Sequence, residues 1–95
     1  MNIAREHGIE VDKIILFGSR ARGDYTEDSD WDVLVVTKEE VDNKRKVDFI
    51  VELKILFARL NIPNDIIVKS REELDEEKNY AFTISSFALK EGISI

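Results

Sequence analysis

Two aspartates that flank a tryptophan are the residues of this chain whose spacing best suits chemistry. Asp30 and Asp32 stand where a strand is predicted, at about residues 31–37, and side chains two positions apart on a strand share one face. Carboxylates held that close repel each other unless a cation intervenes, and hard divalent cations prefer oxygen ligands. We therefore expect the pair to hold Mg²⁺. For an arbitrary pair of this spacing, two solvated acids at a strand edge would be the commoner explanation.

A glycine and a serine earlier in the chain favour a phosphate-binding turn. Gly18 and Ser19 follow a predicted buried strand, residues 11–17, and lead into a short helical turn with Ser19 as its N-cap. Backbone N–H groups and the positive end of the helix dipole attract phosphate oxygens at such a junction. The Ser19 hydroxyl is a further donor, and Arg20 and Arg22 add charge, although one of them could instead brace the turn through a salt bridge. Without the acids that follow, a tight turn and a helix cap would be the simpler interpretation.

A third carboxylate would complete a two-metal site, in which paired ions hold the attacking and leaving oxygens of a phosphoryl transfer. Asp48 and Asp65 are the candidates. Asp48 lies on the polar side of a predicted long helix, whereas Asp65 begins a predicted strand, residues 65–68, that could lie beside Asp30 and Asp32. We favour Asp65 and keep Asp48 as the alternative.

The same region also has the spacing of an EF-hand calcium loop. The first, third, fifth and twelfth positions of such a loop would be Asp28, Asp30, Asp32 and Glu39. The sixth position requires glycine for a sharp turn and is Val33 here, inside a Val-Leu-Val-Val run that is typical of a strand. A calcium loop is therefore disfavoured.

Hydrophobic periodicity predicts the elements that position these residues. A short helix at residues 2–8 precedes the first strand, and Gly23 ends the turn that begins at Ser19. A long helix is expected at about residues 39–60. Its buried stripe would be Phe49, Leu53, Leu56, Phe57 and Leu60.

The rest of the chain predicts a third strand and two more helices. Ser70 and Glu73 form a capping box, so a helix should begin at Arg71. Gly92 closes a last helix and is followed by an apolar tail. The apolar stripe of that last helix would be Ile84, Phe87 and Ala88. The fold class is therefore α/β in the α+β sense, a small sheet covered by helices.

Composition limits the class of protein. The chain has 95 residues, 43% of them hydrophobic and 36% charged, which is typical of one small globular domain over residues 1–95. The net charge of −6 disfavours nucleic acid as a partner, because a polyphosphate backbone would repel the chain. Cysteine is absent, so disulfides and thiolate chemistry are excluded and a reducing cytoplasm is the expected location. The apolar runs are far too short to span a bilayer, so no membrane partner is expected.

Residues 14–36 carry a family resemblance. Leu16-Phe17-Gly18-Ser19-Arg20-Ala21-Arg22-Gly23, followed by Asp30-Trp31-Asp32, resembles the minimal nucleotidyltransferase (MNT) family of the DNA polymerase β superfamily. The order of the remaining elements is similar to the family along nearly the whole chain. The resemblance implies a mixed-sheet nucleotidyltransferase core in which the Gly-Ser turn binds the triphosphate and three acids hold two Mg²⁺ ions. The positions that match are Gly18, Ser19, Asp30, Asp32 and Asp65.

The resemblance also implies a function. An Mg²⁺-dependent transferase would move a nucleotide, AMP from ATP or the equivalent from another NTP, to an acceptor hydroxyl and release pyrophosphate. Members of this size often pair with a HEPN-domain protein, and several act as antitoxins that transfer AMP to a tyrosine of the HEPN toxin, which is the expected partner. The alternative is a non-catalytic, nucleotide-binding antitoxin that acts by covering a partner protein. The nucleotide base, the acceptor and a homo-oligomeric assembly stay open.

Overall fold

A four-stranded sheet with helices on both of its faces organises the part of the chain that the structure describes. The structure is a computed structural model, and it describes residues 2–77, 88–90 and 92–95. In chain order its elements are α1 (Asn2–Glu6), β1 (Val11–Phe17), α2 (Ser19–Arg22), β2 (Trp31–Thr37), α3 (Asn43–Arg59), β3 (Asn64–Ser70), α4 (Arg71–Glu77) and β4 (Ile93–Ser94).

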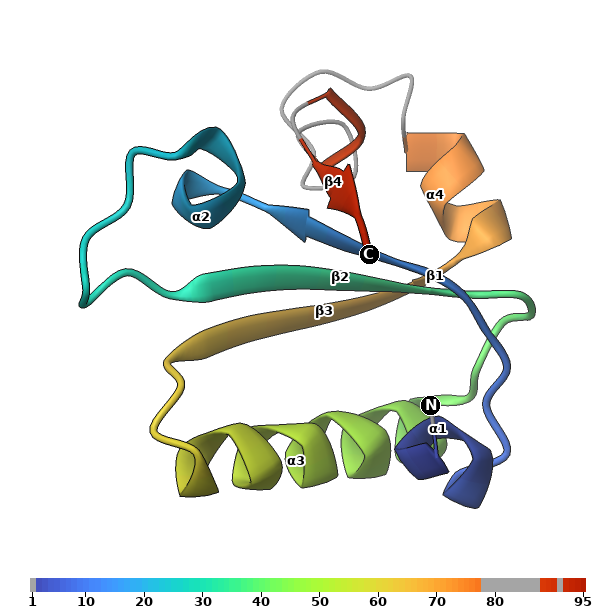
Figure 1. Cartoon of the computed structure of the whole chain (residues 1–95). Coiled ribbons are helices and arrows are strands. Elements are labelled where there is room, and N and C mark those ends of the chain that lie inside the picture. The colour runs from blue at the N-terminus through green and yellow to red at the C-terminus, as the bar shows by residue number, and fades with distance from the viewer. Residues whose placement is uncertain (1, 78–87, 91) are drawn as a thin grey trace.

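The strand order is β3-β2-β1-β4, so β2 lies inside the sheet (Figure 1). β2 pairs antiparallel with β1 and parallel with β3. A parallel neighbour requires a crossover connection, and α3 supplies it by running along one face of the sheet between the two strands. The predicted mixed sheet flanked by helices is therefore confirmed.

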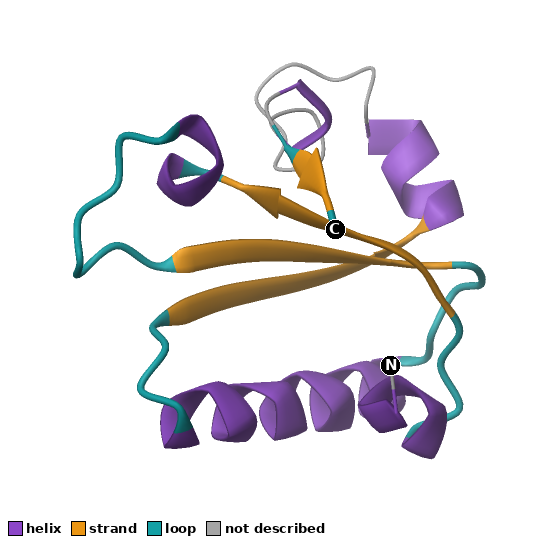
Figure 2. Ribbon diagram, viewed as in Figure 1, coloured by secondary structure: helices purple, strands orange, loops and turns teal. Residues whose placement is uncertain are grey.

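Each face of the sheet carries its own apolar cluster, because successive side chains of a strand point to opposite faces. Toward α3, side chains of β2 and β3 pack around Phe49, which is fully buried. On the other face, Leu34 and Val36 pack with Leu74 of α4 (Figure 2). Even-numbered residues of β2 therefore point to the α4 side of the sheet, and odd-numbered residues point to α3.

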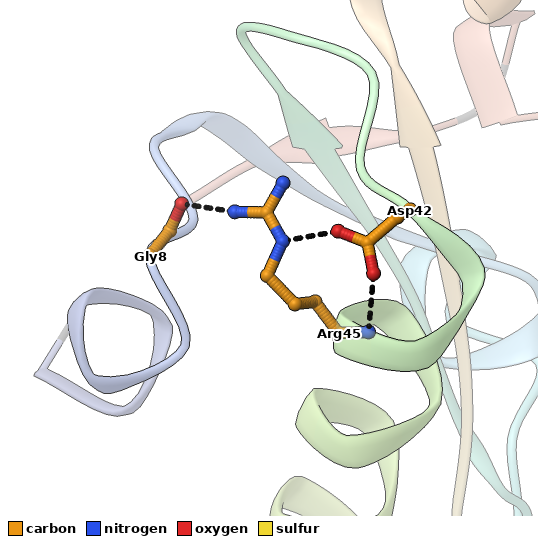
Figure 3. Close-up of polar contacts among 3 residues, drawn as sticks. All are labelled: Gly8, Asp42 and Arg45. Atoms are coloured by element: carbon orange, nitrogen blue, oxygen red, sulfur yellow. Dashed lines mark hydrogen bonds and ion pairs between the residues drawn. The ribbon is translucent and has the colours of Figure 1, made fainter.

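Hydrogen bonds over three residues determine where two helices begin. One carboxylate oxygen of Asp42 accepts a hydrogen bond from the backbone N–H of Arg45 at 3.1 Å, and the other accepts one from Nε of the same arginine (Figure 3). With Asp42 as its cap, α3 begins at Asn43 and not at the predicted residue 39. At α4 the predicted capping box is confirmed, because the Glu73 N–H donates to Ser70 Oγ at 3.1 Å and the Ser70 N–H donates to Glu73 Oε1 at 3.3 Å.

The C-terminal tail corrects the sequence prediction. Residues 93–94 form β4 and pair antiparallel with Ile15 and Leu16 of β1, where the sequence predicts only an apolar tail. Pairing satisfies backbone groups that β1 would otherwise present at an open sheet edge. The predicted last helix, with Ile84 and Phe87 in its stripe, lies outside the described residues except at its C-terminal end.

The predicted stripe of α3 is right at Phe49, Leu53 and Phe57 and wrong at Leu56 and Leu60. Phe49 and Leu53 are buried, but Leu56 and Leu60 are 40% and 58% exposed. Phe57 between them is partly buried and packs against the cluster around Phe49, whereas residues 58–61 are exposed. In the ranges that the structure describes, no helix combines the length and apolarity that crossing a membrane requires.

Candidate active site

The register of β2 brings the predicted site residues together at one end of the sheet. Asp32 pairs with Phe17, the last residue of β1, and with Asp65 near the start of β3. Residues paired across strands share a face, so Asp32 and Asp65 lie side by side on the face opposite α3. Gly18 directly follows Phe17 and therefore reaches the same place.

A backbone hydrogen bond joins the starts of the two parallel strands. The Trp31 N–H donates to the Pro63 carbonyl at 2.9 Å. Asp30 and Asp65 are exposed, whereas Asp32, on the strand between β3 and β1, is half-buried. The three carboxylates of Asp30, Asp32 and Asp65 therefore lie at a solvent-accessible end of the strands, which we call the acidic edge.

Gly18 brings the backbone of the turn directly against the Asp32 side chain. Its φ of 74° and ψ of −159° lie in a region that essentially only glycine adopts. A Cβ on Gly18 would lie 2.9 Å from Cγ of Asp32 and closer still to its Oδ2. Any other residue here would strain the backbone and displace the carboxylate.

The short helix α2 is capped differently from the prediction. Gly18 occupies the N-cap position and Ser19 is the first helical residue, which corrects the predicted Ser19 cap. Gly23 ends the turn as predicted, in a left-handed conformation with φ 90°, and its N–H donates to the Ser19 carbonyl at 2.9 Å. A glycine cap has no side chain that can accept hydrogen bonds from the first N–H groups of a helix. Those groups are the donors that phosphate binding requires.

The surroundings of Asp32 make its ionised form less favourable than that of a free aspartate. Burial is the main cause that raises the pKa of Asp32 above the ordinary value of 3.8, and the charges of Asp65 and Asp30 raise it further. The Arg22 guanidinium lowers the pKa, but it does not reverse the shift. A cation at this edge would offset the repulsion among the acids.

The two arginines of the turn have different neighbours. Arg22 Nε donates to Asp24 Oδ2 at 3.3 Å, an ion pair within the turn region as predicted for one of the arginines, and its charge also acts on Asp32. Arg20 lies instead over the rings of Tyr25 and Trp31, with its Cζ 4.5 Å and 4.6 Å from the ring centroids. The contact with Tyr25 could not be predicted from the sequence, because nothing in its spacing to Arg20 indicates it.

Asp48 and Asp65, the two candidates for the third acid, lie in different layers. Asp48 is exposed on α3, which covers the sheet face opposite the Asp32 side chain. Asp65 is the in-register neighbour of Asp32. The structure therefore places the favoured candidate at the acidic edge and the alternative away from it.

The geometry does not suit the calcium-loop alternative. Val33 would have to form the sharp turn of an EF-hand loop, but it pairs with β1 on one side and with β3 on the other. The chain therefore runs straight through the sheet where the loop would have to bend.

The donors at the acidic edge fit a hard divalent cation. All of them are carboxylate oxygens, the ligand type that Mg²⁺ prefers. Within residues 2–77, 88–90 and 92–95, no three histidine, aspartate or glutamate side chains are arranged to hold one metal ion together. Magnesium at phosphoryl-transfer sites typically takes one or two carboxylates and completes its shell with substrate phosphates and waters. Asp32 and Asp65 supply that number of carboxylates.

The site thus combines a mixed sheet, a glycine turn against Asp32 and a second acid on the adjacent parallel strand. Residues 2–92 match the family described as nucleotidyltransferase domain. The chain therefore belongs to the nucleotidyltransferase domain family, which confirms the family and the enzyme class predicted from the sequence.

Two relatives from Methanocaldococcus jannaschii have considerable sequence identity to the chain. The protein named "Putative protein adenylyltransferase MJ0604" is 41% identical over 73 residues, which cover 76% of this chain and 67% of the relative. The protein named "Putative protein adenylyltransferase MJ0141" is 35% identical over 83 residues, which cover 79% of this chain and 80% of the relative.

Solved structures share the fold at low sequence identity. A crystal structure of a toxin-antitoxin with AMP-PNP has a TM-score of 0.65 and 19% identity, and the match covers 98% of this chain and 66% of that chain. A crystal structure of a mutant toxin-antitoxin MntA-HpeT has a TM-score of 0.63 and 16% identity, with the same coverage of both chains. This chain thus spans about two thirds of the length of these solved chains.

Proposed function

We propose that this chain transfers AMP from ATP to an acceptor hydroxyl and releases pyrophosphate. The observation that carries the proposal is the packing of Gly18 on Asp32, with Asp65 in register beside it. A phosphate-binding turn against a group of acids is what transfer from a bound triphosphate requires. The family of the chain and the adenylyltransferase names of its two relatives support AMP as the transferred group.

The three acids have different roles at the reacting phosphorus. Asp30 and Asp32 would hold two Mg²⁺ ions, and Asp65 would bind the ion nearer the acceptor, with substrate phosphates and waters as the other ligands. When bound, the ions stabilise charge on the attacking and leaving oxygens. Asp65, which is exposed, takes up the proton that the acceptor hydroxyl loses as its oxygen bonds to the α-phosphorus. The bond from the α-phosphorus to the oxygen bridging the β-phosphate breaks, and pyrophosphate leaves with that electron pair.

The turn holds the leaving group. Backbone N–H groups of Gly18 and Ser19, with the Ser19 hydroxyl, donate to the β- and γ-phosphates. Arg20 and Arg22 are the residues predicted to add positive charge there. Of the two, Arg22 is supported better by its position, because its charge already acts on the acidic edge.

We further propose that the acceptor is a tyrosine of a HEPN-domain toxin and that the chain is the antitoxin. Asp30 and Asp65 lie at an exposed edge, which leaves room for a side chain of another protein to approach. Toxin-antitoxin structures share the fold, and one of them is a complex with AMP-PNP, which supports a toxin partner and an ATP-like ligand.

Transfer of label from ATP tests the proposal. The chain, Mg²⁺ and a HEPN-domain protein encoded next to it are incubated with ATP labelled at the α-phosphate and, separately, at the γ-phosphate. Adenylyl transfer predicts α-label on a tyrosine of the partner and no γ-label. Asp65→Asn should abolish labelling, whereas the matched control Asp48→Asn, a change of the same kind on the other layer, should keep it.

Two results would change the conclusion. If wild type and Asp32→Asn bind the partner equally well and neither transfers label, the chain is the non-catalytic antitoxin of the alternative hypothesis. If Asp48→Asn abolishes labelling and Asp65→Asn does not, the third acid has been assigned to the wrong layer.

A further inference from the structure

Arg20 ties the helical turn to the loop that precedes Asp30. Its guanidinium lies over the rings of Tyr25 and Trp31. Its Nη2 donates to the Ser29 carbonyl at 3.1 Å. The contacts of this one side chain therefore reach the residue before Asp30 and the residue after it.

The orientation of Arg20 has a cost in hydrogen bonding. Among the residues that the structure describes, its Nε is the buried side-chain nitrogen or oxygen that has no hydrogen-bond partner. A buried N–H group of this kind gives up its hydration without compensation, and native structures contain few of them. The two aromatic rings and the Ser29 carbonyl are the contacts that hold the side chain in this orientation.

The segment held by Arg20 carries an acid of the proposed site. The Trp31 N–H is bonded to the Pro63 carbonyl, so the strand side of Asp30 is anchored to the start of β3. On the loop side, Ser29 is held by Arg20 and by a turn in which its N–H donates to the Thr26 carbonyl at 3.1 Å. Asp30 itself is exposed, and its position depends on these two neighbours.

We propose that Arg20 is a positioning residue for Asp30. By holding Ser29 and the Trp31 ring, it determines where the Asp30 carboxylate can meet a divalent cation. The inference rests on the proposed function, because it takes Asp30 as a metal ligand. A planar guanidinium can lie flat on aromatic faces while its N–H groups point sideways to carbonyls, and a lysine ammonium cannot do both.

Metal binding to the full chain tests the positioning role of Arg20 separately from catalysis. Mn²⁺ affinity is measured by calorimetry, alone and with AMP-PNP, for wild type, Arg20→Lys and Arg20→Gln. Both variants should bind Mn²⁺ about 10-fold more weakly, the lower end of what losing a group that orients a metal ligand costs. The matched control is Arg5→Gln, because α1 lies at the other end of the sheet from α2 (Figure 1). Its affinity should stay within about 2-fold of wild type, since salt screens charges that far apart.

The lysine variant separates positioning from a phosphate contact. If Arg20 served the phosphates by its charge, Arg20→Lys would keep Mn²⁺ affinity and most of the AMP-PNP affinity. A positioning role predicts that Arg20→Lys and Arg20→Gln lose Mn²⁺ affinity alike, already without nucleotide. Tyr25 supplies a second pair of variants, in which Tyr25→Phe keeps the ring and the affinity while Tyr25→Leu lowers the affinity.

The fluorescence of Trp31, the one tryptophan of the chain, reports on the stack itself. Both Arg20 variants should change the emission of the metal-free protein, and Arg5→Gln should not. Changed emission with unchanged Mn²⁺ affinity in folded Arg20→Gln, as judged by far-UV circular dichroism, would overturn the proposal. Absence of Mn²⁺ binding by wild type, with and without AMP-PNP, would instead contradict the proposed function on which it rests.

Discussion

Two aspartates near the two ends of β2 have opposite electrostatic surroundings. Asp42 follows β2 and caps α3, and the Arg45 that pairs with it also donates from Nη1 to the Gly8 carbonyl at 2.9 Å (Figure 3). The hydrogen bond from the Arg45 side chain is the main cause that holds the pKa of Asp42 below its ordinary value. The pKa of Asp32 is raised instead, by burial first and then by the neighbouring acids.

The difference separates an acid that supports the fold from an acid available for chemistry. The fold itself supplies Asp42 with donors, so its charge is compensated in the folded chain. Asp32 is half-buried beside Asp65 and Asp30, and Arg22 offsets only part of the resulting cost of its charge. Shifted pKa values of this kind gather at functional sites, where stability is given up for binding.

Neutralising Asp32 should have the largest effect on activity, and it should lower activity while it raises stability. Asp32→Asn should lower the rate of adenylyl transfer by about 10³-fold, because metal-assisted charge stabilisation is worth several kcal/mol. The thermal midpoint of the metal-free variant at neutral pH should rise, because the amide removes first the cost of burying a charge and then the like-charge repulsion. Asp42→Asn should do the reverse, with full activity and a lower midpoint. Label transfer and thermal unfolding followed by circular dichroism measure both, and a midpoint of Asp32→Asn below that of wild type would contradict the comparison.

A methyl group at position 18 should displace the Asp32 carboxylate and strain the backbone of the turn. Gly18→Ala places a Cβ against Asp32 at a conformation that costs about 1–3 kcal/mol for other residues, so it should lower both stability and activity. Gly23→Ala is the matched control, since Gly23 also has a positive φ but no atom lies within 4 Å of its added Cβ. It should lose stability by about 1–2 kcal/mol and keep its transfer rate. Equal activities of the two variants would show that the Gly18 contact is dispensable.

Acid titration should give the smallest effect, and the stabilities of the Asp32 and Asp42 variants relative to wild type should depend on pH in different ways. Asp42, with its pKa lowered, adds stability that is present above pH 3.8 and is lost as the pH falls through its folded-state pKa. Asp32, with its pKa raised, costs stability at neutral pH, and this cost disappears as the pH falls toward 3.8. In urea unfolding, the advantage of Asp32→Asn over wild type should therefore shrink from pH 7 to about pH 4, while the deficit of Asp42→Asn persists there and shrinks only below. A parallel pH dependence of the two differences would show that the surroundings of the two acids are alike.

Much of the fold could be predicted from neighbouring residues. The bounds of β1 and β2 follow from short apolar runs that end at Gly18 and Thr37, and the α4 start follows from Ser70 and Glu73. These features depend on backbone preferences and hydrogen bonds over a few residues, which is the range that a sequence pattern describes. The same holds for Asp32, which the alternation of β2 puts on one face with Leu34 and Val36, whereas Asp30 directly precedes the strand.

Contacts between distant segments could not be predicted in this way. The tail forms β4 because it pairs with the open edge of β1, and Leu56 and Leu60 of the predicted α3 stripe are exposed although Phe57 between them packs on the core. The stack of Arg20 on Tyr25 and Trp31 likewise depends on how the loop folds back on α2.

The sequence by itself determined which residues could do chemistry here: a glycine-serine turn after one strand and a pair of aspartates at the next. Only the tertiary structure decided that Asp65, and not Asp48, joins them, and that Gly18 lies on Asp32. The physical reason is that the α3 crossover and the parallel register of β2 with β3 place residues far apart in the chain at one level of the sheet. Local patterns of hydrophobicity and charge do not specify that register.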